Sequence, residues 1–198
     1  MNPEIRKFWQ TADFRHINPA ADTEFPEGWD VREELRDSLA DRSVAEIGCG
    51  YGRLCAAFQA ERYVGYDLSP TAIAEARRRF PAYRFTVMSE DNDFAPSEAV
   101  LLYTVLLHVD DNDIGPFIER LAAKTNFVLV AEIMGRAWRR AGDPPVFNRE
   151  RQEYVDMFAR QGFALDDIVT APYARYKNTQ ITFLAFTNQR PVQEGLPA

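Results

Sequence analysis

A short apolar run that ends in three glycines limits the fold of this chain more than any other feature. The run Val44-Ala-Glu-Ile47 leads directly into Gly48, Gly50 and Gly52, and a second apolar run ends at the acid Asp67. Glycines at a strand-to-helix turn adopt unusual backbone angles and let a ligand approach the main chain. A carboxylate at the end of the next strand can bind the hydroxyls of a ribose. The combination predicts a site for an adenosine-containing cofactor.

The spacing of the glycines separates two classes of cofactor. Dinucleotide-binding folds carry G-x-G-x-x-G, and Arg53 occupies the place of the third glycine here. The chain instead has E-x-G-x-G-x-G, beginning at Glu46, which resembles the first motif of class I S-adenosylmethionine-dependent methyltransferases of the small-molecule type. The resemblance continues at Asp67, in the run Tyr103-Thr-Val-Leu-Leu-His-Val109 and near residues 154–163, and extends over residues 40–187.

Strand and helix patterns alternate along the chain. Strands are expected near residues 43–47, 63–66, 83–88, 99–103, 127–133, 163–169 and 180–187, and helices near 71–80, 114–124 and 149–161. Ser69 and Asn148 are the expected N-caps of the first and last of these helices, and Gly162 the expected C-terminal glycine. Such alternation predicts an α/β fold, Rossmann-like and doubly wound, with helices on both faces of a mostly parallel sheet. The resemblance implies seven strands, the last one antiparallel.

The chain length fits one domain, which we expect over residues 41–190, preceded by a helical segment over residues 1–40 that could form a lid. Net charge is −7, which argues against a nucleic-acid partner. No apolar run is long enough to span a membrane, and the first residues lack the apolar core of a secretion signal, so we expect a cytoplasmic protein. Cys49 and Cys55, in the glycine loop and its helix, are expected to be free thiols, and no metal site is expected.

The resemblance implies a set of contacts to S-adenosylmethionine as cofactor. Glu46 is an acid inside an apolar strand, which is costly to bury unpaired, and its family counterpart supports the glycine loop and the methionine end. Asp67 is expected to bind the ribose, although it could instead be a surface acid. One of Ser89, Glu90 and Asp91 is expected to contact the adenine. The expected cofactor-binding residues are Glu46, Gly48, Cys49, Gly50, Gly52, Asp67, Leu68, Ser89, Glu90, Tyr103 and Thr104.

Two histidines are candidates for acid–base chemistry. His108 lies in a run that resembles the V-L-H-H-V segment of many small-molecule methyltransferases, and an imidazole with an ordinary pKa of about 6.5 can serve as a general base near neutral pH. Packing beneath the cofactor is an equal alternative for His108. His16 is the second candidate, and an acceptor that is already anionic would need no base.

Acceptor contacts are expected from the N-terminal segment, from the loop at residues 135–148 and from the turn before the last strand. The aromatic N-terminal residues could cover the cofactor or simply pack at the edge of the fold. Arginines in the loop suit an anionic acceptor but could equally be solvated. The candidate substrate residues are Trp9, Phe14, Arg15, Arg136, Trp138, Tyr173 and Tyr176.

These features favour a methyltransferase that acts on a small-molecule acceptor, mainly at oxygen. The Asn/Asp-Pro-Pro-aromatic signature of enzymes that methylate amide or base nitrogens is absent after the fourth strand. Alternatives are methylation of a glycan or glycan-phosphate end, a cofactor-binding protein without catalysis and, disfavoured by Arg53, a nicotinamide-dependent oxidoreductase. The sequence predicts neither the acceptor nor the oligomeric state.

Overall fold

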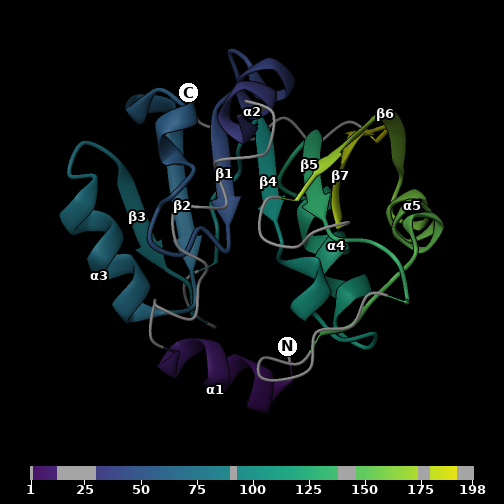
Figure 1. Cartoon of the computed structure of the whole chain (residues 1–198), viewed down its shortest axis with the longest axis horizontal. Coiled ribbons are helices and arrows are strands. Elements are labelled where there is room, and N and C mark those ends of the chain that lie inside the picture. The colour runs from purple at the N-terminus through teal and green to yellow at the C-terminus, as the bar shows by residue number, and fades with distance from the viewer. Residues whose placement is uncertain (1, 13–29, 90–92, 138–145, 174–178, 191–198) are drawn as a thin grey trace.

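The computed structural model describes residues 2–12, 30–89, 93–137, 146–173 and 179–190, which form a seven-stranded sheet between two layers of helices (Figure 1). The strand order is β3-β2-β1-β4-β5-β7-β6, and β7 runs antiparallel to both of its neighbours whereas β1 to β5 pair in parallel. The strands are β1 Val44–Ile47, β2 Tyr63–Asp67, β3 Arg84–Val87, β4 Ala99–Tyr103, β5 Phe127–Glu132, β6 Phe163–Pro172 and β7 Gln180–Asn188. The predicted fold is confirmed, including the antiparallel last strand.

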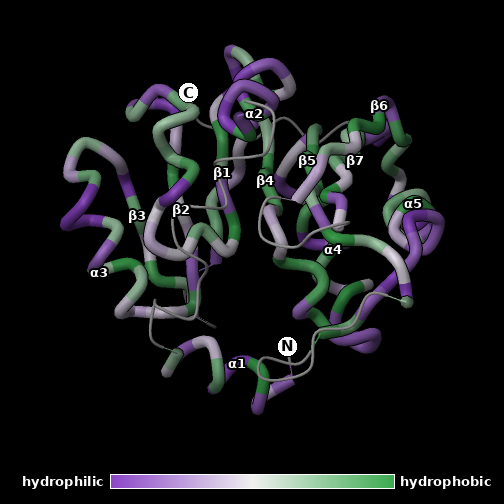
Figure 2. The backbone as a smooth tube through the Cα atoms, viewed as in Figure 1, coloured by the Kyte–Doolittle hydropathy of each residue, from purple (hydrophilic) through white to green (hydrophobic). Residues whose placement is uncertain are grey.

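Two apolar clusters hold the helices to the sheet. Helices α2 (Val31–Leu39) and α3 (Pro70–Arg79) pack on one face, and α4 (Ile114–Ala122) and α5 (Arg151–Arg160) on the other. Strand β4 is buried on both faces, which explains its unbroken apolar sequence. Figure 2 shows hydrophobic residues along the central strands and hydrophilic residues on the outer parts of α3 and α5.

Local sequence signals explain most helix ends, with two corrections. Helix α3 starts as predicted, because the Ser69 hydroxyl accepts a hydrogen bond from the backbone N–H of Ala72 at 3.2 Å. Helix α5 does not start at Asn148: its N-cap is Glu150, which forms a reciprocal capping box with Glu153. The expected helix after the glycine loop is replaced by turns and the short 3-10 helix η4 (Cys55–Ala57).

Helix α1 (Pro3–Thr11) lies across the end of the sheet to which the parallel strands point (Figure 1). At its start, the backbone N–H of Asn2 donates to a carboxylate oxygen of Asp113, just before α4, at 2.5 Å. Past its end, the carbonyl of Ala12 accepts from the hydroxyls of Ser69 and Thr71, at the start of α3. Helix α1 therefore connects the first turns of two helices that pack on opposite faces of the sheet.

Candidate active site

The glycine loop follows β1 at the carboxyl end of the sheet. Gly48, Gly50 and Gly52 have φ angles of +76°, +55° and +80°, a region that other residues rarely adopt. A Cβ atom on Gly48 would lie 2.6 Å from Cγ2 of Val105, so this glycine is also required by the close approach of the chain after β4. The backbone at Gly48 is exposed, as the approach of a ligand requires.

Asp67 ends β2 and braces the glycine loop. Its side chain is only 8% exposed, and its two oxygens accept hydrogen bonds from the backbone N–H groups of Gly50 and Ser69, both at 2.8 Å. Burial raises the pKa of this carboxyl, and the backbone hydrogen bonds oppose that rise. Each carboxylate oxygen can accept a second hydrogen bond. The position and spare acceptors of Asp67, beside the half-buried Leu68, fit the ribose of an adenosine cofactor.

Glu46 is buried in β1, just before the glycine loop. Its carboxylate accepts a hydrogen bond from the Tyr63 hydroxyl at 2.5 Å. Burial raises the pKa of Glu46 to about 7, although the Tyr63 hydrogen bond and the positive charge of Arg53 both act to lower it. The Arg53 guanidinium lies 5.1 Å from the ring centroid of Tyr103. The acid of the motif is therefore paired with Tyr63, which was not among the predicted site residues.

The other predicted cofactor residues border the same end of the sheet. Ser89 is exposed just after β3, Tyr103 is buried at the end of β4, and Thr104 follows it with an unusual φ of +55°. The thiol of Cys49 is buried, and burial raises its pKa well above the ordinary value, so it is not a nucleophile at neutral pH. Glu90 lies outside the described residues.

His108 and Trp9 come together over this end of the sheet. His108 ends the 3-10 helix η6 (Leu106–His108) after β4, and its ring centroid lies 4.9 Å from that of Trp9 on α1, with the planes inclined by 61°. Trp9 also meets Phe8 edge to face at 5.2 Å. The structure thus joins a predicted catalytic residue and a predicted substrate residue that are far apart in the sequence.

The remaining predicted substrate residues have different surroundings. The Arg136 guanidinium forms an ion pair with Glu153 on α5, and its backbone N–H donates to Glu150 at 2.7 Å. Tyr173 is buried at the end of β6, and its N–H donates to the carbonyl of Thr179 at 2.8 Å. Predicted residues that lie outside the described ranges are Phe14, Arg15, His16, Trp138 and Tyr176.

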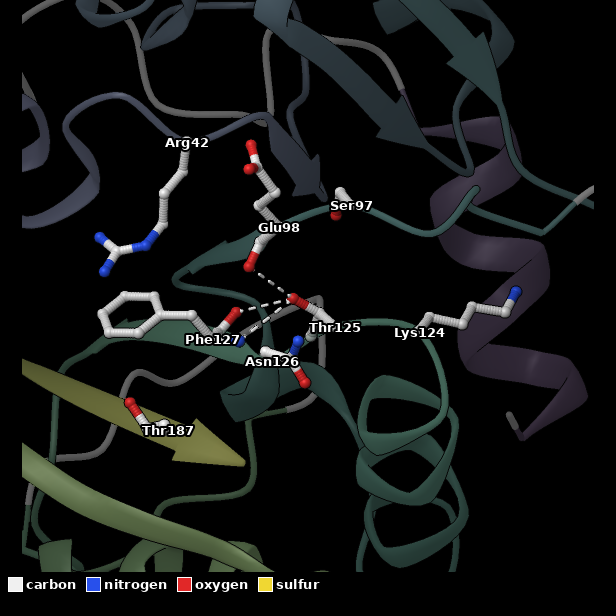
Figure 3. A pocket seen from close by; sticks show the side chains of 8 residues that line it. All are labelled: Arg42, Ser97, Glu98, Lys124, Thr125, Asn126, Phe127 and Thr187. Carbon is white, nitrogen blue, oxygen red and sulfur yellow. Dashed lines mark hydrogen bonds between the residues drawn. The ribbon is translucent and has the colours of Figure 1, made fainter. Parts of the chain in front are cut away.

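A cavity of about 280 Å³ lies at the opposite end of the sheet, where β1, β4 and β5 begin (Figure 3). Its lining residues are Arg42, Ser97, Glu98, Lys124, Thr125, Asn126, Phe127 and Thr187, none of them a predicted site residue. Within the described ranges, no cluster of three or more His, Cys, Asp or Glu side chains is suited to a metal ion. None of the helices in the described part of the chain has the length and apolar composition needed to cross a bilayer.

Comparison with known proteins shows what this chain is similar to. Residues 45–124 match a family described as methyltransferase domain. A ubiquinone biosynthesis O-methyltransferase of Rhodopseudomonas palustris (strain BisA53) is 30% identical over 171 residues, which cover 81% of this chain and 65% of the relative. The similarity identifies residues 45–124 as a methyltransferase domain. The chain spans just under two thirds of the length of this curated relative.

Solved structures share the fold of this chain. Magnesium protoporphyrin IX methyltransferase (ChlM) from Synechocystis PCC 6803, with bound S-adenosylmethionine, superposes with a TM-score of 0.66 at 13% identity, covering 93% of this chain and 95% of that one. The [4+2]-cyclase SpnF superposes with a TM-score of 0.63 at 12% identity, covering 80% and 79%. Such a fold hosts more than one kind of reaction, so the reaction has to be argued from the site.

Two buried ionisable residues near the candidate site were missed by the sequence analysis. Glu132, the last residue of β5, is fully buried, and Arg149, just before α5, is 2% exposed. Glu132 carried the same signal as Glu46, an acid inside an apolar strand, and could have been found by it. Arg149 lies between ordinary polar residues in the sequence and carried no such signal.

Proposed function

We propose that this methyltransferase transfers the methyl group of S-adenosylmethionine to a hydroxyl oxygen of a small molecule. The observation that carries the proposal is the contact between the glycine loop and the chain after β4, where Val105 packs against Gly48. His108 comes three residues after Val105, which supports the assignment of the candidate base and the candidate cofactor loop to one site. The curated relative, whose name is that of an O-methyltransferase, supports oxygen as the acceptor atom.

The cofactor supplies a methyl group on a sulfonium. The acceptor oxygen forms a bond to the methyl carbon, the electron pair of the carbon–sulfur bond stays on sulfur, and the hydroxyl proton must leave. His108 takes this proton in the proposal. Asp67 and the glycine loop hold the cofactor, and α1 with Trp9 covers the acceptor. Orientation of this kind can contribute roughly 7–11 kcal/mol to lowering a barrier.

A neutral hydroxyl is favoured over an anionic acceptor. Among the arginines of the loop at residues 135–148, the structure describes Arg136. Its guanidinium forms an ion pair with Glu153. The negative net charge of the chain also disfavours phosphate-rich acceptors. Both observations support a small uncharged acceptor over a glycan-phosphate end.

The test has a binding stage and a turnover stage. Calorimetry with S-adenosylhomocysteine, S-adenosylmethionine and NAD should show binding of the first two and none of NAD. Transfer of a radiolabelled methyl group is then measured with a panel of phenols and alcohols, with Asp67→Ala as the negative control. Label in an O-methyl product supports the proposal. Binding of the cofactor without transfer to any hydroxyl in the panel would favour a non-catalytic cofactor-binding protein.

A further inference from the structure

The segment between β4 and η6, which leads to His108, is held through its backbone. The N–H groups of Val105, Leu106 and Leu107 all donate to one carboxylate oxygen of Glu132, at 2.8, 2.6 and 3.4 Å. Burial raises the pKa of Glu132 to about 8, and these three hydrogen bonds oppose that rise. A single buried side chain from β5 thus accepts hydrogen bonds from three consecutive backbone N–H groups of the segment.

Arg149 holds the carbonyl groups of the same segment. Its guanidinium donates to the backbone carbonyls of Leu106 and Val109 at 3.0 and 2.7 Å. It also donates to the carboxylate of Asp111 at 2.6 Å, and this third hydrogen bond further fixes the orientation of the guanidinium. In residues 105–109, which include His108, backbone N–H groups therefore donate to Glu132 and backbone carbonyl groups accept from Arg149.

The backbone at the start of this segment is strained. Thr104 is β-branched and has a φ of +55°, a conformation that costs roughly 1–2 kcal/mol for an L-residue. Such strain persists only where the surroundings over-determine the geometry, and it is often found at functional sites. Val105, the residue after Thr104, carries the first of the three N–H groups that donate to Glu132.

Stability alone does not account for the burial of these two ionisable side chains. Replacing buried ionic groups with apolar residues of similar size is often neutral or stabilising, so their burial is weak support for a purely structural role. The free oxygen of Glu132, Oε2, also has no hydrogen-bond partner among the described residues. The hydrogen bonds of both side chains converge instead on the backbone around His108.

We propose that Glu132 and Arg149 are positioning residues that set the imidazole of His108 against Trp9 and beside the glycine loop. Neither is a catalytic residue in this proposal, since both act through the backbone of residues 105–109. The kinetic consequence rests on the proposed methyl transfer, whereas the placement of the ring does not. The two parts can be tested separately.

The first measurement reports on the His108 ring without any turnover. The chain has two histidines, so His16→Gln leaves one imidazole, and its proton resonances can be followed by NMR in the full-length protein. In that background, Glu132→Leu and Arg149→Met should shift or broaden the His108 resonance. The conservative variant Glu132→Gln, which keeps the accepting oxygen, should stay close to the parent spectrum, whereas Arg149→Lys, with one nitrogen for three acceptors, should give an intermediate change.

A matched control separates positioning from general destabilisation. Thr125 is buried at the far end of the sheet, where its hydroxyl donates to the carbonyls of Glu98 and Phe127 (Figure 3). Thr125→Val should lower the melting temperature yet leave the His108 resonance unchanged. Unchanged resonances in folded Glu132→Leu and Arg149→Met would overturn the proposal. Failure of both variants to fold would also overturn it, because the two residues would then be folding elements.

The second measurement is kinetic. Glu132→Leu and Arg149→Met should lower kcat by roughly 10–100-fold, since a displacement of about 1 Å at a reacting group can cost 10²-fold. S-adenosylhomocysteine affinity and the activity of Thr125→Val should change little. If the His108 resonance moves but no hydroxyl acceptor is methylated by the parent, positioning stands and the proposed function fails.

Discussion

The imidazole of His108 packs against the indole of Trp9, with the ring centroids 4.9 Å apart and the planes inclined by 61°. Trp9 belongs to α1 and His108 follows β4, so the contact exists because α1 crosses the carboxyl end of the sheet. Edge contacts between aromatic rings contribute about 0.5–1.5 kcal/mol beyond burial of area. The contact therefore restricts the orientation of the proposed base.

Replacing His108 tests the proposed proton transfer. We expect His108→Ala to lower turnover by roughly 10²–10⁴-fold, because the acceptor hydroxyl would lose its base. Cofactor affinity should change little, and the wild-type rate should rise with pH through an apparent pKa that the variant lacks. His108→Gln keeps polarity and size, so near-normal turnover with the wild-type pH profile in that variant would make His108 structural.

Removing the indole of Trp9 tests whether α1 acts as a lid. Trp9→Leu should lower turnover by up to roughly 10²-fold, since the base and the acceptor would lose a fixed wall. Deletion of residues 1–20 should have a larger effect while the sheet still folds. Thr11→Ala is the matched control, because the Thr11 hydroxyl bonds only to carbonyls of its own helix among the described contacts and is exposed. Full activity of the truncated protein would show that α1 only packs at the edge of the fold and does not act as a lid.

The role of Asp67 can be measured without an acceptor. Asp67→Ala should weaken S-adenosylhomocysteine binding by about 1.5–3 kcal/mol, the range of a hydrogen bond to a charged group. Asp67→Asn keeps one acceptor and should lose less. Glu98→Ala removes a carboxylate that binds Arg62 and the Ser43 N–H at the far end of the sheet, and should bind the cofactor normally. An Asp67→Ala protein that is folded and binds as tightly as the wild type would contradict the assigned ribose contact.

The buried acid Glu46 predicts a pH dependence of stability. Its pKa is raised to about 7 in the folded protein, whereas a glutamate in an unfolded chain titrates at about 4.3. Between these values the folded state holds a proton that the unfolded state has lost, so the free energy of unfolding should fall as pH rises from about 4.3 to 7. This contribution is at most about 4 kcal/mol and is complete above pH 7.

Urea unfolding at pH 5 and pH 8 measures this effect. Glu46→Gln cannot titrate, so its stability should depend less on pH than that of the wild type, and the variant should gain relative stability at pH 8. Glu75→Gln is the control, because pairing with Arg78 and Arg79 on α3 lowers the pKa of the Glu75 carboxyl, which therefore stays ionised at both pH values. The same pH dependence in Glu46→Gln and the wild type would show that Glu46 ionises normally in the fold.

Local sequence determined the fold and identified the candidate cofactor residues. The glycines after β1 are recognisable because glycine adopts their positive φ angles without strain. The acid that ends β2 is recognisable because few side chains can bind the hydroxyls of a ribose. The apolar runs of β4 and β5 predicted buried parallel strands, and the start of α3 followed from Ser69 and Pro70. These features depend on neighbours within a few residues, which the sequence displays directly.

The tertiary structure alone decided what surrounds His108. Its ring contact comes from α1, and its backbone is held by Glu132 from β5 and by Arg149 from the segment before α5. The same holds for the pairing of Glu46 with Tyr63, which requires β1 and β2 to lie side by side. None of these contacts has a local pattern, because each depends on the packing of elements that are distant in the sequence, and that packing is set by the two apolar clusters on the faces of the sheet.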